Sequence, residues 1–327
     1  MLPLSPGRTS RDSAAGVAAE GGRPALRVES LGRFSIVGEN GTPLAGEGLV
    51  RELMAALLAA LAACGKQEPP TAPAPDSAAE PGPSPVSDVR LYVLDCGEVD
   101  VLDLGVFDEG GSYDGQKDSL VDTCYLVRHP QGELMWDAGL PDSLAQMPEG
   151  SSDGTFTVRV PKPLQGQLER LGVPPSAIDF FSISHSHFDH LGNANLFRDS
   201  TFIINRRERE HMFRDEARAD SATFSGYADL EAAKTVQFDD SYDVFGDGST
   251  LIVSMPGHTP GHSVLLVNLK NTGPVLLTGD LYHFTEARER KTVPRFNTNA
   301  DDTRASMAKF EELAAASGAR VIIQHEP

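Results

Sequence analysis

Short apolar runs alternate with polar segments from about residue 88 to the end of the chain. Many of these runs are bounded by turn residues and rich in β-branched and aromatic side chains, which is typical of strands. We predict strands over 89–94, 123–127, 133–136, 180–184, 201–204, 251–254, 263–267, 275–277 and 321–323, and helices over 164–171 and 303–316. No internal repeat of fixed period accompanies them. The pattern predicts a domain of mixed strands and helices over residues 88–327.

The first part of the chain lacks this pattern. Residues 1–48 mix Gly, Ala, Ser and Arg without sustained periodicity, so we expect a disordered segment or an over-extended gene start and assign it no function. Residues 65–87 are rich in Pro, Ala, Ser and Glu and contain almost no large apolar residue. This composition is typical of an extended linker.

A short apolar run lies between these two segments. Residues 53–63 are too few to span a bilayer, which takes roughly 20 apolar residues, but they suit the hydrophobic region of a signal peptide. The ending Leu61-Ala62-Ala63-Cys64 resembles a bacterial lipobox, which predicts a lipoprotein signal over 49–64 and a lipid on the Cys64 sulfur. Gly65 favours the periplasmic side of the outer membrane. The alternative is a cytoplasmic protein with a buried Ala/Leu helix and a chance cysteine.

The chain is acidic and has few cysteines. Its formal net charge of −19 indicates that it lacks the basic surface that neutralises phosphates, so we expect no nucleic-acid partner and a membrane contact only through the lipid. The three cysteines form no CxxC pair, so metal chemistry must rest on His and Asp. Cys96 and Cys124 could bridge in an oxidising compartment, but we expect two buried thiols.

Three histidines and one aspartate lie within six residues, directly after the apolar run 180–184. His185 and His187 point the same way in an extended chain that leaves a strand, so they can bind one metal ion. A sharp turn eased by Gly192 would let Asp189 and His190 bind a second ion. Imidazole and carboxylate ligands suit zinc best, although iron, manganese or cobalt would accept them.

The HxHxDH motif after a buried strand resembles the metallo-β-lactamase superfamily. The resemblance implies an α/β fold of the αββα type, in which helices flank two mixed β-sheets. It also implies three later ligands after predicted strands: His258 for the first ion, Asp280 as a carboxylate that bridges both ions, and His325 for the second. We therefore expect two divalent metal ions, with zinc as the best candidate, and no organic cofactor.

Three further residues are expected to support these ligands through hydrogen bonds. Asp137 lies in an acidic turn after the predicted strand 133–136, and such turns in this superfamily hold metal ligands. A solvated turn aspartate is an equally good interpretation. We also place His262 and His283 beside the ligands.

Two neighbouring ions acidify a shared water and polarise a carbonyl or phosphoryl oxygen. Hydrolysis is therefore the predicted chemistry, in which hydroxide attacks an ester carbonyl while the ions stabilise the oxyanion and hold the leaving oxygen. Asp189 or Asp280 would carry the proton. Such a mechanism needs no covalent enzyme intermediate.

Parts of this domain resemble the N-acyl homoserine lactonases, which open the lactone ring of bacterial quorum-sensing signals. The similar segments are residues 89–97, 124–130, 134–141 and 258–262. In those enzymes a tyrosine three residues after the bridging aspartate hydrogen-bonds the substrate. Here His283 has that position and Tyr282 precedes it, so we predict a catalytic role for Tyr282, with His283 as the alternative.

The expected partner is a small lactone or ester. The alternatives are a glyoxalase II-like thioesterase, another ester or phosphotriester hydrolase, and a non-catalytic metal-binding module, which the completeness of the ligand set disfavours. Loops 108–117 and 141–161 are candidate walls of the substrate pocket. Apolar contacts are predicted from Phe107, Met147, Phe156 and Phe284. These segments could equally be ordinary surface loops with scattered core residues.

Overall fold

The computed structural model describes residues 25–29, 33–37 and 86–327 of a chain that divides into two compact units, Met1–Ala74 and Pro75–Pro327. In the first unit, β1 (Ala25–Glu29) and β2 (Arg33–Val37) pair in antiparallel fashion. The sequence predicted no regular structure over 1–48, because five-residue strands are too short to show sustained periodicity. The predicted signal over 49–64, its Cys64 and nearly all of the linker lie outside the described residues.

The second unit contains two mixed β-sheets. The larger sheet has eight strands in the order β10-β9-β8-β5-β4-β3-β7-β6. Its strands are β3 (Arg90–Val101), β4 (Asp118–His129), β5 (Gly132–Trp136), β6 (Ser151–Ser152), β7 (Phe156–Arg159), β8 (Phe180–Ser182), β9 (Thr201–Asn205) and β10 (Thr235–Phe238). The smaller sheet has five strands in the order β11-β12-β13-β14-β15. Its strands are β11 (Ser241–Asp243), β12 (Thr250–Ser254), β13 (Ser263–Leu269), β14 (Gly273–Leu277) and β15 (Arg320–Ile322).

Helices connect these strands. The α-helices are α2 (Leu164–Arg170), α3 (Phe188–Leu191), α4 (Arg206–Met212), α5 (Asp215–Ala219), α6 (Ser221–Phe224), α7 (Thr285–Arg290) and α8 (Ala300–Ser317). Short 3₁₀ helices are η1 (Leu104–Phe107), η2 (Asp142–Gln146), η3 (Pro175–Ala177), η4 (Ala194–Phe197), η5 (Ala228–Glu231) and η6 (Gly279–Leu281). The predicted strands and both predicted helices are present, whereas β6, β7, β10, β11 and the helices α3 to α7 were not predicted from the sequence.

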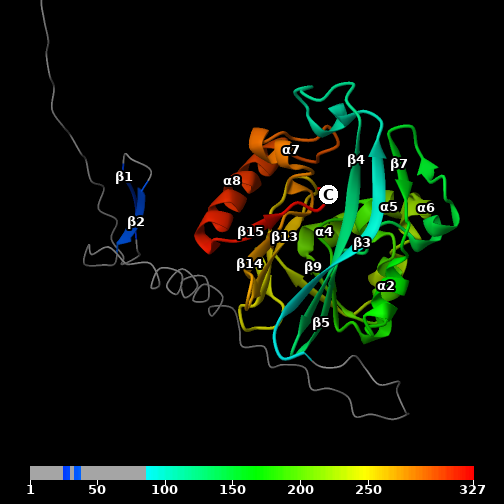
Figure 1. The fold of residues 1–327 in the computed structure, drawn as a ribbon, viewed down its shortest axis with the longest axis horizontal. Coiled ribbons are helices and arrows are strands. Elements are labelled where there is room, and N and C mark those ends of the chain that lie inside the picture. Colours follow the sequence, from blue (N-terminus) through cyan, green and yellow to red (C-terminus); the bar gives the residue numbers. More distant parts are fainter. Residues whose placement is uncertain (1–24, 30–32, 38–85) are drawn as a thin grey trace, which may run out of the picture. The chain divides into compact units, whose positions relative to one another are not determined.

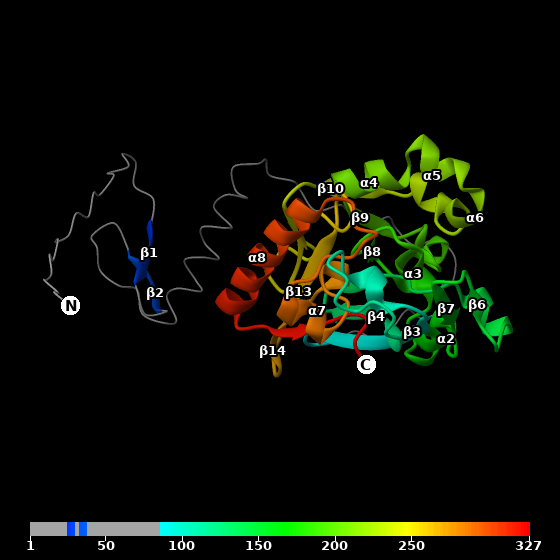
Figure 2. The ribbon, with the colours of Figure 1, turned by 90° about the horizontal axis from the view of Figure 1, so that it is seen from above.

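The two sheets pack face to face, with helices on their outer sides (Figures 1 and 2). Strand β4 shows why, because its side chains alternate between two apolar clusters. Tyr125 and Val127 face the smaller sheet, whereas Cys124 and Leu126 point toward the cluster that includes helix α2. Phe310 of α8 lies in the cluster on the outer face of the smaller sheet. This is the predicted αββα architecture.

Cys96 of β3 and Cys124 of β4 form a disulfide, with their Cα atoms 5.8 Å apart. The expectation of two separate buried thiols is therefore wrong. The register between the two strands shifts between Asp95 and Gly97, so Cys96 occupies a bulge beside Cys124. Spacing along the sequence does not reveal the register of two strands or the position of a bulge.

Four strands end at one region between the sheets. β14 and β15 are parallel, and β12 runs in the same direction because β13 is antiparallel to both of its neighbours β12 and β14. The chain segments that follow β12, β14 and β15 carry His258, Asp280 and His325, and the segment after β8 carries His185. Residues distant in the sequence meet there.

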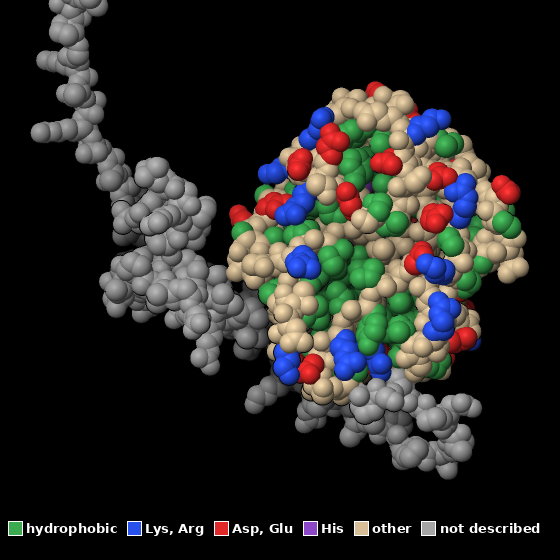
Figure 3. All heavy atoms as spheres, in the orientation of Figure 1, with side chains coloured by type: hydrophobic (Ala, Val, Ile, Leu, Met, Phe, Trp, Pro, Cys, Tyr) green, Lys and Arg blue, Asp and Glu red, His purple; other side chains and the backbone are tan. Residues whose placement is uncertain are grey.

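The described helices are short or polar, and one face of the second unit carries charges of both signs (Figure 3). Within the described residues, no helix has both the length and the apolar character needed to cross a membrane. On the face shown in Figure 3, acidic and basic side chains are interspersed around an apolar stretch. The charge of this face therefore does not form one large field of a single sign.

Candidate metal centre

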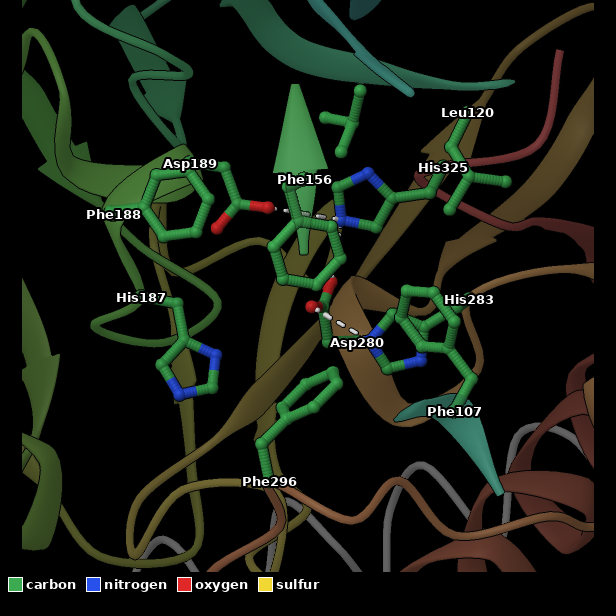
Figure 4. A pocket seen from close by; sticks show the side chains of 11 residues that line it. Phe107, Leu120, Phe156, His187, Phe188, Asp189, Asp280, His283, Phe296 and His325 are labelled. Carbon is green, nitrogen blue, oxygen red and sulfur yellow. Dashed lines mark hydrogen bonds and ion pairs between the residues drawn. The ribbon is translucent and has the colours of Figure 1, made fainter. Parts of the chain in front are cut away.

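The seven predicted metal ligands form two adjacent groups. His185, His187, His258 and Asp280 each offer a ligand atom within 4.8 Å of the others, and so do Asp189, His190 and His325. Most of these side chains are buried, including His185 and His190 with no exposed surface. Figure 4 shows His187 and His325 on opposite sides of Asp280.

Asp280 lies between the two groups. Its Oδ1 is 3.0 Å from His325 Nε2 and 3.3 Å from His190 Nε2. Its Oδ2 is 3.5 Å from His258 Nε2 and 3.6 Å from His185 Nε2. One carboxylate oxygen therefore faces each group, which is the arrangement expected of a bridging ligand.

The chain between β8 and α3 positions the first motif. His187 has an extended backbone and immediately precedes α3, so His185 and His187 leave the strand together while Asp189 and His190 lie in the helix. Gly192 has an ordinary helical φ of −56°. Glycine is therefore not needed at this position for a sharp turn, as predicted, but for close packing. A Cβ on residue 192 would lie 2.2 Å from the Pro141 nitrogen.

Asp137 supports the second group by contacting the ring nitrogen of His190 that faces away from Asp280. It is completely buried and adopts a left-handed backbone conformation with a φ of 61°. Its Oδ1 accepts a hydrogen bond from the Ser184 N–H at 2.6 Å, and its Oδ2 lies 3.1 Å from His190 Nδ1. Oδ2 also accepts from Gln324 Nε2 at 2.9 Å. A carboxylate at Nδ1 favours the tautomer that leaves Nε2 free for a metal.

His262 supports Asp280 through the backbone. Its Nε2 accepts a hydrogen bond from the Asp280 N–H at 3.0 Å, while its Nδ1 lies 3.1 Å from the Met255 carbonyl oxygen and donates to it. Burial lowers the pKa of His262 to about 3, which keeps this ring neutral. The structure thus places His262 beside the ligands, as expected from the sequence.

Glu208 of α4 supports the first group and was not predicted from the sequence. It is completely buried and accepts four hydrogen bonds from the segments that carry the first group of ligands. In the sequence it stands among Arg206, Arg207 and Glu210, in a stretch that resembles a solvated charged helix. Nothing local distinguishes Glu208 from its exposed neighbour Glu210.

Tyr282 points away from the cavity, whereas His283 lies beside the predicted ligand Asp280, as expected, and also lines the cavity. The Tyr282 hydroxyl donates to Glu311 Oε1 at 3.0 Å, and its ring packs on Phe310 in the apolar cluster under α8. His283 lines the cavity, with Nε2 3.1 Å from Asp280 Oδ2. The backbone of Tyr282 is extended, so consecutive side chains point to opposite sides. The geometry does not support the catalytic role predicted for Tyr282.

A cavity of about 220 Å³ opens beside the two groups. His187, Asp189, Asp280, His283 and His325 form its polar side, and its other walls are Val99, Phe107, Leu120, Phe156, Phe188 and Phe296 (Figure 4). The predicted contacts Phe107 and Phe156 are therefore present. Phe284 instead packs behind Phe107, and Met147 is 47% exposed and does not line the cavity. The cavity suits a substrate with an apolar part beside its reacting group.

The protonation states differ between the two groups. Burial, followed by repulsion from neighbouring imidazoles, holds the pKa of His185 and His187 well below the ordinary value. Burial also acts to lower the pKa of His190 and His325, but nearby carboxylates, above all Asp280, outweigh it and raise the pKa of His325 to about 9. Metal binding at the second group therefore releases protons, since a ligand imidazole must be neutral.

The chemistry of this cluster fits metal ions. Buried polar atoms normally have hydrogen-bond partners, yet His190 Nε2 makes no hydrogen bond within the described residues, although it points at Asp280. Imidazoles and carboxylates converge in two sets, which are the ligands that zinc takes. The residues present therefore suit two divalent ions.

This fold and ligand set define a class of protein. The profile of the Metallo-beta-lactamase superfamily matches residues 120–325, which is more than half of the chain. The chain therefore belongs to the metallo-β-lactamase superfamily, as the HxHxDH motif indicated.

Within that superfamily the chain is similar to N-acyl homoserine lactonases. The N-acyl homoserine lactonase AttM of Azorhizobium caulinodans is 30% identical over 251 residues, which cover 74% of this chain and 95% of that protein. AttM of Agrobacterium fabrum is 31% identical over 252 residues, with the same shares covered.

A solved structure shares the fold. It is an N-acyl homoserine lactone hydrolase with the product N-hexanoyl-L-homoserine bound at its catalytic metal centre. It aligns with a TM-score of 0.61 and 23% identity, over 74% of this chain and 94% of that one. Together with the sequence relatives, it confirms the predicted fold and the predicted class, a hydrolase whose fold binds divalent metals, typically zinc.

Proposed function

We propose that this protein is a dinuclear zinc hydrolase that opens the lactone ring of N-acyl homoserine lactones. The observation that carries the proposal is the position of Asp280, with one carboxylate oxygen toward each imidazole group at the floor of an apolar cavity. The similarity to lactonases over most of the domain supports the choice of substrate.

The first ion would be held by His185, His187 and His258, the second by Asp189, His190 and His325, and both by Asp280. When bound, the two ions acidify water and polarise the lactone carbonyl. Substrate binding, the exclusion of water and proton transfer would come from the side chains around the cavity.

Three features of the cavity would act on the substrate. The aromatic walls, including Phe107 and Phe156, bind the acyl chain and exclude bulk water from the reacting carbonyl. Asp189 is the carboxylate that both lines the cavity and retains some exposure, so it is placed to take a proton from water and return it to the leaving ring oxygen. His283 offers its Nε2 to an oxygen of the substrate.

The reaction is tested with purified, zinc-loaded protein and three substrates: an N-acyl homoserine lactone, a glutathione thioester and a phosphotriester. We expect turnover of the lactone, with ¹⁸O from labelled water in the new carboxylate and none in the hydroxyl, because the acyl–oxygen bond breaks. His187→Ala should remove essentially all turnover. Cleavage of the thioester with no reaction on lactones of any chain length would overturn the lactonase assignment and leave a hydrolase.

The assignment of the substrate contact to His283, the alternative to Tyr282, has its own test. His283→Leu removes the Nε2 donor and is expected to lower kcat/KM on the order of 10²-fold, as loss of one hydrogen-bond donor to a developing oxyanion does. Tyr282→Phe should leave kcat/KM close to that of the wild type, because the Tyr282 hydroxyl hydrogen-bonds Glu311 and does not line the cavity. A large loss of kcat/KM for Tyr282→Phe with no loss for His283→Leu would contradict this assignment.

A further inference from the structure

We infer that Glu208 is the positioning residue of the first metal site, holding its two ligand-bearing loops at the separation that one ion requires. This inference rests on the dinuclear centre proposed above. It concerns a residue that does not line the cavity and whose carboxylate accepts hydrogen bonds from Ser186, Thr259 and Gly261, none of which is a predicted ligand.

The carboxylate of Glu208 connects the two loops of the first ligand group. Its Oε1 accepts hydrogen bonds from the Ser186 N–H at 2.8 Å and the Ser186 hydroxyl at 2.5 Å. Its Oε2 accepts from the Thr259 hydroxyl at 2.7 Å and the Gly261 N–H at 2.8 Å. Each oxygen thus serves one loop.

These donors are neighbours of the ligands in the chain. Ser186 lies between His185 and His187, and Thr259 follows His258 directly. The first loop leaves β8 of the larger sheet, whereas the second leaves β12 of the smaller sheet. Glu208 therefore joins the two sheets at the point where three imidazoles must converge.

Glu208 packs tightly against the second loop. A Cβ on Gly261 would lie 2.4 Å from the Glu208 nitrogen, so this loop packs directly on the backbone of α4. Glu208 itself is completely buried, and its four donors are two backbone N–H groups and two hydroxyls. A buried carboxylate is tolerated when hydrogen bonds satisfy it, and those bonds are the strong, charge-assisted kind. An amide at this position would lose the charge and turn a donor toward one of the loops.

The second ligand group provides the internal comparison. Asp137 contacts His190 directly, whereas Glu208 acts on the first group through backbone and hydroxyl donors of the two loops that carry it. Replacing a residue that positions one site should weaken zinc binding at that site alone. Replacing a residue that only stabilises the fold should change the zinc affinity of both sites alike.

The experiment measures zinc affinity by chelator competition in two backgrounds, each with one site dismantled. His325→Ala leaves the first site, and His187→Ala leaves the second. In the first background Glu208→Gln is expected to weaken zinc binding about 10- to 100-fold, the usual effect of removing a residue that orients ligands. In the second background it should leave the affinity unchanged. Glu210→Gln, an exposed change on the same helix, is the matched control.

Thr259→Val removes one donor without changing the shape and should give a smaller loss in the His325→Ala background only. It serves as the second variant if Glu208→Gln folds poorly, which thermal unfolding of the metal-free chain would show. Equal weakening in both backgrounds, or none in either, would overturn the positioning role. A wild-type chain that binds no zinc would instead overturn the proposed function and with it the centre itself.

Discussion

Asp122→Asn is expected to stabilise the metal-free chain at pH 8 and to change its stability little at pH 4. Asp122 of β4 is completely buried, and its Oδ2 accepts a hydrogen bond from the Leu140 N–H at 2.9 Å. Its Oδ1 has no hydrogen-bond partner within the described residues. Burial, with repulsion from Asp189 next in size, raises the pKa of Asp122 to about 7.

The sign of the effect follows from proton linkage. The folded chain keeps the Asp122 proton up to about pH 7, whereas the unfolded chain loses it near the ordinary value of 3.8. Stability is therefore greatest below the unfolded pKa, falls as the pH rises from about 4 to 7, and then levels off. A difference of about 3 pH units corresponds to a loss on the order of 4 kcal/mol. Asparagine resembles the protonated acid and cannot ionise, so it avoids this loss.

The free energy of unfolding is measured in urea with EDTA present, at pH 4 and pH 8. Trp136 is the single tryptophan of the chain and is fully buried, so its fluorescence reports the transition. Asp118→Asn, an exposed change on the same strand, is the control and should behave like the wild type at both pH values. If Asp122→Asn and the wild type differ by the same amount at pH 4 and pH 8, Asp122 does not carry the proton and the reasoning is refuted.

Two predictions concern the metal content and the location of the protein. Elemental analysis should find close to two ions per chain. Asp280→Ala should lower the occupancy of both sites, because one carboxylate oxygen faces each group. A stable count of one ion in protein never treated with chelator would contradict the dinuclear centre. We also propose that Cys64 is lipidated, a proposal that the disulfide between Cys96 and Cys124 supports because disulfides persist in oxidising compartments such as the periplasm. Radioactive palmitate should label the wild type and not Cys64→Ser in a Gram-negative host, and unmodified chain in the cytosol would argue against export.

The reliable predictions from sequence were local ones. A strand shows itself by its apolar residues, and the HxHxDH motif holds four candidate ligands in six residues, so both can be recognised without knowing the rest of the fold. The resemblance to the metallo-β-lactamase superfamily implied His258, Asp280 and His325, each after a predicted strand, and the structure brings all three into the two groups. For Asp137 the sequence left a solvated turn aspartate as an equal alternative, and the structure shows it buried against His190.

The tertiary structure decided whatever depends on contacts between distant residues. The alternation of an extended chain sends Tyr282 into the core and His283 into the cavity, and the sequence does not show which side is which. A bulge in β3 brings Cys96 beside Cys124. Glu208 differs from exposed helix glutamates only because two loops from different sheets converge on it. Strand register and loop packing are set by the whole fold, so a linear pattern determines which residues are available as ligands, and only their packing decides which side chains orient them.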